Sequence, residues 1–183
     1  MEAQRDFLLQ VIEALERASV VYAVTGSWAS TTYGLPRTTH DLDVVLAISV
    51  EQAAELAAAF PAPFYADPEW MQRAAAEQTF FNVIDPASGL KVDFWPAKAD
   101  EFSQAQFKRR RQQDLFGRRV WMLAPEDVIL SKLLWYQSSP SETQLRDCVG
   151  IWKTRRATLD QAYLLEWARR LNIEDLLTRV MAA

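Results

Sequence analysis

The 183-residue sequence has very few of the side chains that build thiol and zinc sites. It contains one cysteine, Cys148, and one histidine, His40. A single cysteine cannot form an intrachain disulfide, and these counts argue against a zinc site of the usual His/Cys type. Any catalytic triad that needs a histidine would depend on His40. We therefore look for metal sites with oxygen ligands.

The sequence also lacks a cationic start followed by an apolar run, and no apolar stretch approaches the length of a membrane span. Half of the residues are hydrophobic and 24% are charged, which is ordinary for a globular protein. We therefore predict a soluble cytoplasmic protein with no membrane partner.

The charge balance is acidic, with a formal net charge of -4. This argues against a protein that coats nucleic acid by bulk electrostatics. The run Lys108–Arg111 is locally basic, and two interpretations stay open for it. It is either the solvated face of a helix or a ridge that binds RNA or an acidic protein surface as acceptor.

The order of apolar patterns predicts one α/β (α+β) fold, in which a mixed-sheet core over residues 1–123 carries a helical C-terminal part over residues 124–183. The expected strands are residues 20–24, 42–48 and 118–123, and a hairpin of residues 79–85 and 90–95. The expected helices are residues 6–17, 27–34, 51–60, 100–116 and 125–137, with further helices from residue 141 onward.

Three aspartates stand where strands are expected. Side chains alternate along a strand, so Asp41 and Asp43 point to the same face and repel each other unless a cation or shared proton lies between them. Asp93 is the one acid inside an apolar strand pattern. If its strand pairs beside the first, three carboxylates converge. Such an all-oxygen site suits Mg²⁺ or Mn²⁺.

A Gly-Ser pair separates an apolar strand from an expected helix start. Backbone N–H groups and the positive end of a helix at Gly26 and Ser27 can hold phosphate oxygens, and Gly26 permits close approach. A Gly-Ser pair or an Asp-x-Asp motif alone is a weak signal. Their ordered combination with Asp93 is more specific.

This combination, over residues 20–95, resembles the DNA polymerase beta-like nucleotidyltransferase superfamily. The resemblance implies that Asp41 and Asp43 ligate two metal ions, that Asp93 completes the acceptor-side metal site, and that Gly26 and Ser27 hold the nucleoside triphosphate. It implies transfer of a nucleoside monophosphate to an acceptor hydroxyl of RNA, protein or a small molecule, with release of pyrophosphate. The base would be Asp93 or a metal-bound hydroxide. Thr25 departs from the hydrophobic residue that the superfamily prefers there.

Further stretches resemble a bacterial branch of the superfamily. RTTHDLD, PEDVILSKLLWY and LRDCVGIWK are similar to segments of AbiEii-type and minimal nucleotidyltransferases, and GSWA with THDLD also resembles aminoglycoside and lincosamide nucleotidyltransferases. This resemblance implies a toxin-antitoxin or defence setting, with a partner protein as one option. The alternative function is a nucleotide-binding or catalytically silent module that acts by docking to another protein.

Two cations are candidates for nucleotide binding. Lys132 lies on an apolar helix face, where it either snorkels to solvent or, as the family pattern suggests, binds phosphate. Arg37 either contacts the nucleotide or pairs with one of the nearby aspartates.

Two further features are interpreted as non-catalytic. Arg146 and Asp147 are interpreted as an ion pair on a helix surface rather than as catalytic residues. His40 adjoins Asp41 but is expected on the opposite face of the strand, which argues against a role as general base.

Overall fold

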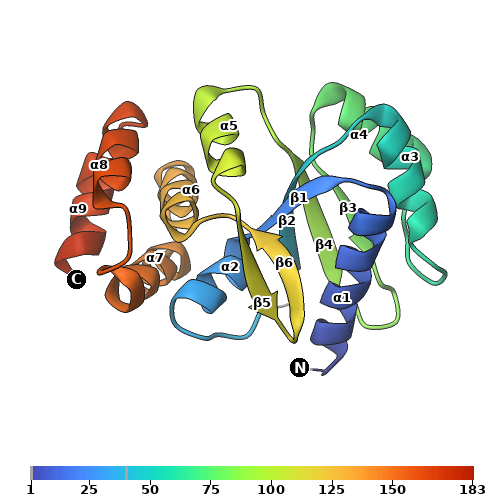
Figure 1. The fold of residues 1–183 in the computed structure, drawn as a ribbon, viewed down its shortest axis with the longest axis horizontal. Coiled ribbons are helices and arrows are strands. Elements are labelled where there is room, and N and C mark those ends of the chain that lie inside the picture. The colour runs from blue at the N-terminus through green and yellow to red at the C-terminus, as the bar shows by residue number, and fades with distance from the viewer. Residues whose placement is uncertain (1, 40) are drawn as a thin grey trace. The chain divides into compact units, whose positions relative to one another are not determined.

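A computed structural model describes residues 2–39 and 41–183 (Figure 1). The chain forms two compact units. Unit 1 comprises Met1–Val24 and Thr39–Met122, and unit 2 comprises Thr25–Thr38 and Leu123–Ala183. The predicted α/β class is confirmed by a six-stranded mixed sheet with helices. The division into domains at residue 123 stays a prediction.

The sheet has the strand order β3-β4-β2-β1-β6-β5. Strand β2 pairs with β4 and β1 pairs with β6 in parallel, whereas β3 pairs with β4 and β5 pairs with β6 in antiparallel direction. The strands span Val21–Thr25 (β1), Asp41–Ala47 (β2), Phe81–Ile84 (β3), Lys91–Pro96 (β4), Arg111–Leu115 (β5) and Arg118–Met122 (β6). The predicted hairpin of β3 and β4 is confirmed, with Gly89 in its turn at a φ of +71°.

The helices of unit 1 bury apolar faces. They span Glu2–Arg17 (α1), Val50–Ala59 (α3), Pro68–Glu77 (α4) and Glu101–Lys108 (α5). The stripe of α1 that includes Leu8, Val11 and Leu15 is fully buried. Ser49 and Gln52 form a capping box that starts α3, which packs against α1 and α4 (Figure 1).

Two sequence predictions are corrected in unit 1. Helix α4 was not predicted; it begins where the Asp67 carboxylate caps two backbone N–H groups and Pro68 occupies the first turn. The helix expected over residues 100–116 ends at Lys108, and β5 follows it. A tight hairpin explains the change, because Phe116 and Gly117 both have positive φ and bring β5 alongside β6. The basic run Lys108–Arg111 therefore joins a helix end to a strand and is not one helix face.

Unit 2 is helical. Its helices span Gly26–Tyr33 (α2), Pro125–Ser138 (α6), Glu142–Arg155 (α7), Gln161–Arg170 (α8) and Glu174–Ala182 (α9). Helix α2 packs against α6 and α7, and α8 packs against α6 and α9. Glu126 and Asp127 in the first turn of α6 are fully buried, and their carboxylates accept hydrogen bonds from the Asp160 backbone N–H and the Tyr163 hydroxyl. Polar bonds thus join α8 to α6.

Candidate active site

The strand pairing in unit 1 brings predicted carboxylates together. In the parallel pair of β2 and β4, Asp43 lies opposite Asp93 and Asp41 lies opposite Lys91. Because side chains alternate along each strand, these four side chains occupy one face of the sheet. Asp93 is only 8% exposed, whereas Asp41 at the start of β2 is exposed. The condition on which the three-carboxylate prediction depended, that the two strands are neighbours, is confirmed.

Lys91 supplies a cation on this face. Its Nζ lies 2.7 Å from Oδ2 of Asp93 and 3.7 Å from Oδ2 of Asp41. The hydrogen bond to Asp93 raises the pKa of Lys91, partial burial opposes this, and the charges of Asp93, Asp41 and Asp43 raise the pKa further. Sequence analysis missed this lysine. The signal was present in the Lys91-Val92-Asp93 spacing, which places both charged side chains on one face of a strand.

The carboxylates have the chemistry of a site for a hard divalent cation. Oδ1 of Asp93 is buried and has no hydrogen-bond partner. A bound cation stabilises an anionic oxygen that is buried without a hydrogen-bond donor. In the arrangement of residues 2–39 and 41–183, no group of three acidic, histidine or cysteine side chains is close enough to hold a metal ion. The donor atoms fit Mg²⁺ or Mn²⁺, and Lys91 contacts the carboxylates of Asp93 and Asp41 here.

The Gly-Ser pair begins α2 in unit 2. Gly26 has a φ of +59°, in the left-handed region that glycine enters without steric cost. Thr25, at the N-cap position, makes no side-chain hydrogen bond to the first turn. Ser27 is nearly buried, and its carbonyl oxygen accepts a hydrogen bond from the Ser30 hydroxyl. This helix start therefore has backbone donors that the Thr25 side chain does not cap.

Arg37 and Lys132, the two predicted nucleotide-binding cations, share one partner in unit 2. Arg37 donates Nε to Oδ1 of Asp147 and an Nη to Oδ2, both at 3.1 Å. Lys132 places Nζ 2.9 Å from the same Oδ2 and donates to Oε1 of Gln144 at 2.9 Å. The Ser30 hydroxyl also donates to Oδ2, at 3.1 Å. The carboxylate therefore orients both cations and α2.

In the Asp147 cluster, defined as Ser30, Arg37, Lys132 and Asp147, the two cations favour the ionised form of Asp147. Burial would raise the pKa of Asp147, but the hydrogen bond from Arg37, the charge and hydrogen bond of Lys132 and the charge of Arg37 together lower it. With two cations and one anion, the cluster has an excess of positive charge.

The interpretation of Asp147 as part of a helix-surface ion pair is wrong, because its side chain is buried. Arg37 does form an ion pair, but its partner is Asp147 rather than Asp41 or Asp43. A sequence signal existed, since Asp147 precedes the buried Ile151 by one helical turn. His40 lies outside the described residues, so its orientation stays a prediction.

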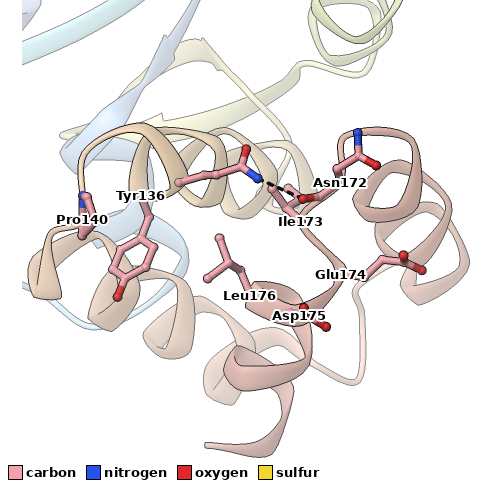
Figure 2. A pocket seen from close by; sticks show the side chains of 8 residues that line it. Tyr136, Pro140, Asn172, Ile173, Glu174, Asp175 and Leu176 are labelled. Atoms are coloured by element: carbon pink, nitrogen blue, oxygen red, sulfur yellow. Dashed lines mark hydrogen bonds between the residues drawn. The ribbon is translucent and has the colours of Figure 1, made fainter.

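Unit 2 also contains a concavity of about 510 Å³ (Figure 2). Its lining consists of Tyr136, Gln137, Pro140, Asn172, Ile173, Glu174, Asp175 and Leu176. The side-chain amide of Gln137 donates a hydrogen bond of 3.0 Å to the backbone carbonyl of Asn172, drawn as a dashed line in Figure 2. None of the predicted site residues lines this concavity, so it is distinct from the sites described above.

Comparison with known proteins assigns the fold. The model of the family described as aminoglycoside-2''-adenylyltransferase matches residues 7–86, which is less than half of the chain. The solution structure of the antibiotic-resistance factor ANT(2'')-Ia superimposes with a TM-score of 0.60 at 13% identity, covering 100% of this chain and 99% of that one. The chain has a nucleotidyltransferase fold.

Other solved structures agree with this fold. The crystal structure of ANT(2'')-Ia in complex with adenylyl-2''-tobramycin gives a TM-score of 0.56 at 14% identity, with 99% of each chain covered. An antigenic nucleotidyltransferase-like protein from Paracoccidioides brasiliensis gives 0.58 at 18% identity, covering 99% of this chain and 93% of that one. No curated protein sequence matches the chain.

These findings bear out the predicted nucleotidyltransferase fold. The AbiEii-type branch has no support among them and stays a prediction. None of the described helices is both long and apolar enough to cross a membrane.

Proposed function

We propose that this protein is a metal-dependent nucleotidyltransferase that moves a nucleoside monophosphate from a nucleoside triphosphate to an acceptor hydroxyl. The observation that carries the proposal is the register of β2 and β4, which sets Asp43 opposite Asp93 with Asp41 on the same face. Within this fold, that arrangement supplies oxygen ligands on a rigid sheet. We assign Asp41, Asp43 and Asp93 as the residues that hold two Mg²⁺ or Mn²⁺ ions.

The reaction is an in-line displacement at the α-phosphorus. The acceptor oxygen forms a bond to phosphorus, the bond from phosphorus to the bridging oxygen of the β-phosphate breaks, and pyrophosphate leaves. Asp93 accepts the proton of the acceptor hydroxyl, a role that its carboxylate in a buried position can fill. The metal ions, when bound, lower the pKa of the acceptor hydroxyl and neutralise charge on the triphosphate. Asp41 and Asp43 would supply carboxylate oxygens to hold these ions.

We assign triphosphate binding to residues of unit 2. Gly26 and Ser27 offer backbone N–H groups at a helix start without a side-chain cap, which suits phosphate oxygens. Arg37 and Lys132 offer the excess positive charge of the Asp147 cluster. In this role Asp147 keeps both cations oriented, so that little side-chain entropy is lost when phosphate binds.

For the acceptor, we propose a small polyhydroxylated molecule of the aminoglycoside class. The support is the match of residues 7–86 to the aminoglycoside-2''-adenylyltransferase model and the similarity to ANT(2'')-Ia, a protein solved with adenylylated tobramycin. RNA and protein acceptors are less favoured, because the basic run that would contact them is divided between a helix end and a strand. Cytoplasmic location, a toxin-antitoxin or defence setting and a partner protein stay predictions from the sequence.

The experiment supplies purified protein with each α-labelled nucleoside triphosphate, Mg²⁺ or Mn²⁺, and tobramycin, a cell extract or no acceptor. We expect label in the aminoglycoside, with stoichiometric release of pyrophosphate. Asp43→Asn should abolish labelling. Asp6→Asn, which neutralises an exposed acid of α1 that pairs with its neighbour Arg5, should leave labelling intact.

The outcomes separate the candidate functions. Label in RNA or protein of the extract would replace the proposed acceptor while keeping the reaction. Binding of nucleotide without turnover, together with capture of a specific partner, would support the docking module instead. Labelling that persists in Asp43→Asn would show that another site or a contaminant transfers the nucleotide.

A further inference from the structure

We propose that Lys91 is a built-in counter-ion of the carboxylates, which holds Asp93 and Asp41 while no metal is bound and must move away when a divalent ion enters. The inference rests on the proposed function, because it concerns the same carboxylates. It adds a residue that competes with the metal and thereby sets the metal concentration at which the site assembles.

The contacts of Lys91 are those of a competitor. Its ammonium group donates a hydrogen bond of 2.7 Å to Oδ2 of Asp93, so it occupies a lone pair that a metal ion would use, and its charge lies 3.7 Å from Oδ2 of Asp41. Lys91 and Asp93 belong to one strand, separated by one residue, and Asp41 lies opposite Lys91 on β2. The sheet register therefore places the backbones of all three residues side by side.

The charge balance favours a cation at this position. Asp41, Asp43 and Asp93 carry three negative charges on one face of the sheet, and repulsion between them would destabilise the fold if no cation were present. Lys91 offsets one of these charges through its contacts with Asp93 and Asp41. If Lys91 stayed in contact with Asp93, its charge would repel the incoming ion at short range.

Lys91 also has room to move. Its side chain is 35% exposed, whereas that of Asp93 is 12% exposed. A lysine has a long flexible stem and a strongly hydrated head, so the ammonium group can turn toward solvent while its stem stays on the sheet. The carboxylate has no such freedom. The same acids can therefore exist in a lysine-held arrangement and a metal-held arrangement.

The test measures binding of Mn²⁺ to the full-length protein without nucleotide. Calorimetry and the decrease in the electron paramagnetic resonance signal of free Mn²⁺ report the binding. Lys91→Met removes the competing charge and keeps the apolar stem. We expect it to bind Mn²⁺ at least about tenfold more tightly than the wild type, the effect of one charge removed at close range. Lys91→Arg keeps the charge, so its affinity for Mn²⁺ should stay closer to that of the wild type.

The matched control is Lys98→Met, which removes the same charge from an exposed lysine beyond the end of β4. It should change the Mn²⁺ affinity by less than about twofold, because solvent screens a charge at an exposed position. Thermal unfolding gives a second measurement. In chelator, Lys91→Met should melt below the wild type, and saturating Mn²⁺ should raise its melting temperature by more than it raises that of the wild type.

Equal or weaker Mn²⁺ binding by Lys91→Met would overturn the inference, as would an equal gain in Lys98→Met. These results differ from a failure of the proposed function. Tighter Mn²⁺ binding without nucleotide transfer would support Lys91 as the counter-ion and count against the enzyme. Nucleotide transfer with no effect of Lys91→Met on Mn²⁺ affinity would count against Lys91 alone. If no variant binds Mn²⁺, both proposals fail.

Discussion

The ammonium group of Lys132 lies 2.9 Å from Oδ2 of Asp147, and both residues are buried, at 6% and 7% exposure. Arg37 completes the arrangement with two hydrogen bonds to the same carboxylate. A buried ion pair of this kind is costly to break, because removal of one partner leaves an uncompensated charge inside the protein. The Asp147 cluster is therefore expected to matter for stability whether or not it binds nucleotide.

Replacement of Asp147 by asparagine should destabilise the protein strongly. The variant keeps the volume of the side chain but leaves Lys132 buried without an anion, which typically costs about 3–5 kcal/mol. Urea unfolding followed by circular dichroism measures this free energy. Glu166→Gln, which neutralises an exposed acid 3.9 Å from Arg170, should cost less than about 0.5 kcal/mol. A similar cost in both variants would contradict the importance of the cluster.

The contribution of Asp147 should disappear in acid. Its pKa is lower in the folded protein than in the unfolded chain, so its stabilisation is fully present above the unfolded pKa of about 3.9 and is lost as the pH falls through the folded pKa. The difference in unfolding free energy between wild type and Asp147→Asn should therefore narrow below about pH 4. A difference that stays constant down to the acid transition would show that another group is responsible.

Gly34→Ala should destabilise unit 2 by steric overlap. A Cβ atom at this position would lie 2.8 Å from the Ile151 backbone nitrogen and 2.9 Å from the Gly150 carbonyl carbon, so backbone atoms of α7 would have to shift. We expect a loss of about 3 kcal/mol in unfolding free energy, the upper end for overpacking. At Gly89, an added Cβ meets nothing within 4 Å, so the cost of alanine comes from the positive φ of this residue. Gly89→Ala should therefore lose about 1 kcal/mol.

Tyr22 should make the protein sensitive to alkali. Burial raises the pKa of its phenol from 10.0 to about 12 in the folded state. Between these two values the unfolded chain has released the proton and the folded protein has kept it, so stability falls as the pH rises. Tyr22→Phe removes this effect and should become more stable relative to the wild type across that window.

Thermal unfolding at several alkaline pH values, with absorbance to count ionised phenols, measures the effect. Tyr65→Phe is the control, since the Tyr65 side chain is 56% exposed rather than buried. A gain in the Tyr65 variant equal to that in the Tyr22 variant would mean that burial of Tyr22 is not the cause.

The local sequence pattern is enough to predict several residues of the candidate site. The alternation of side chains along a strand is enough to put Asp41 and Asp43 on one face, and the apolar neighbours of Asp93 indicate its strand. The Gly26-Ser27 break between strand and helix is also readable, because a left-handed φ at such a junction favours glycine. Each of these inferences depends on neighbours within a few residues.

Local pattern failed where an element depends on distant partners. The residues of β5 read as the continuation of a helix, and only pairing with β6 across a two-residue turn makes them a strand. Likewise, Asp147 reads as a surface acid, yet it is buried because Arg37, distant in sequence, and Lys132 both neutralise it. Propensity is a weak influence that such tertiary contacts override.

The sequence by itself determined which acids share a strand face and which residues end the first strand, because these properties follow from the geometry of a single chain segment. Only the tertiary structure decided that β2 and β4 are neighbours, that Asp43 faces Asp93, and that Lys91 is the cation between strands. Strand order and register are set by the burial of whole faces against the rest of the fold, and no local segment contains that information.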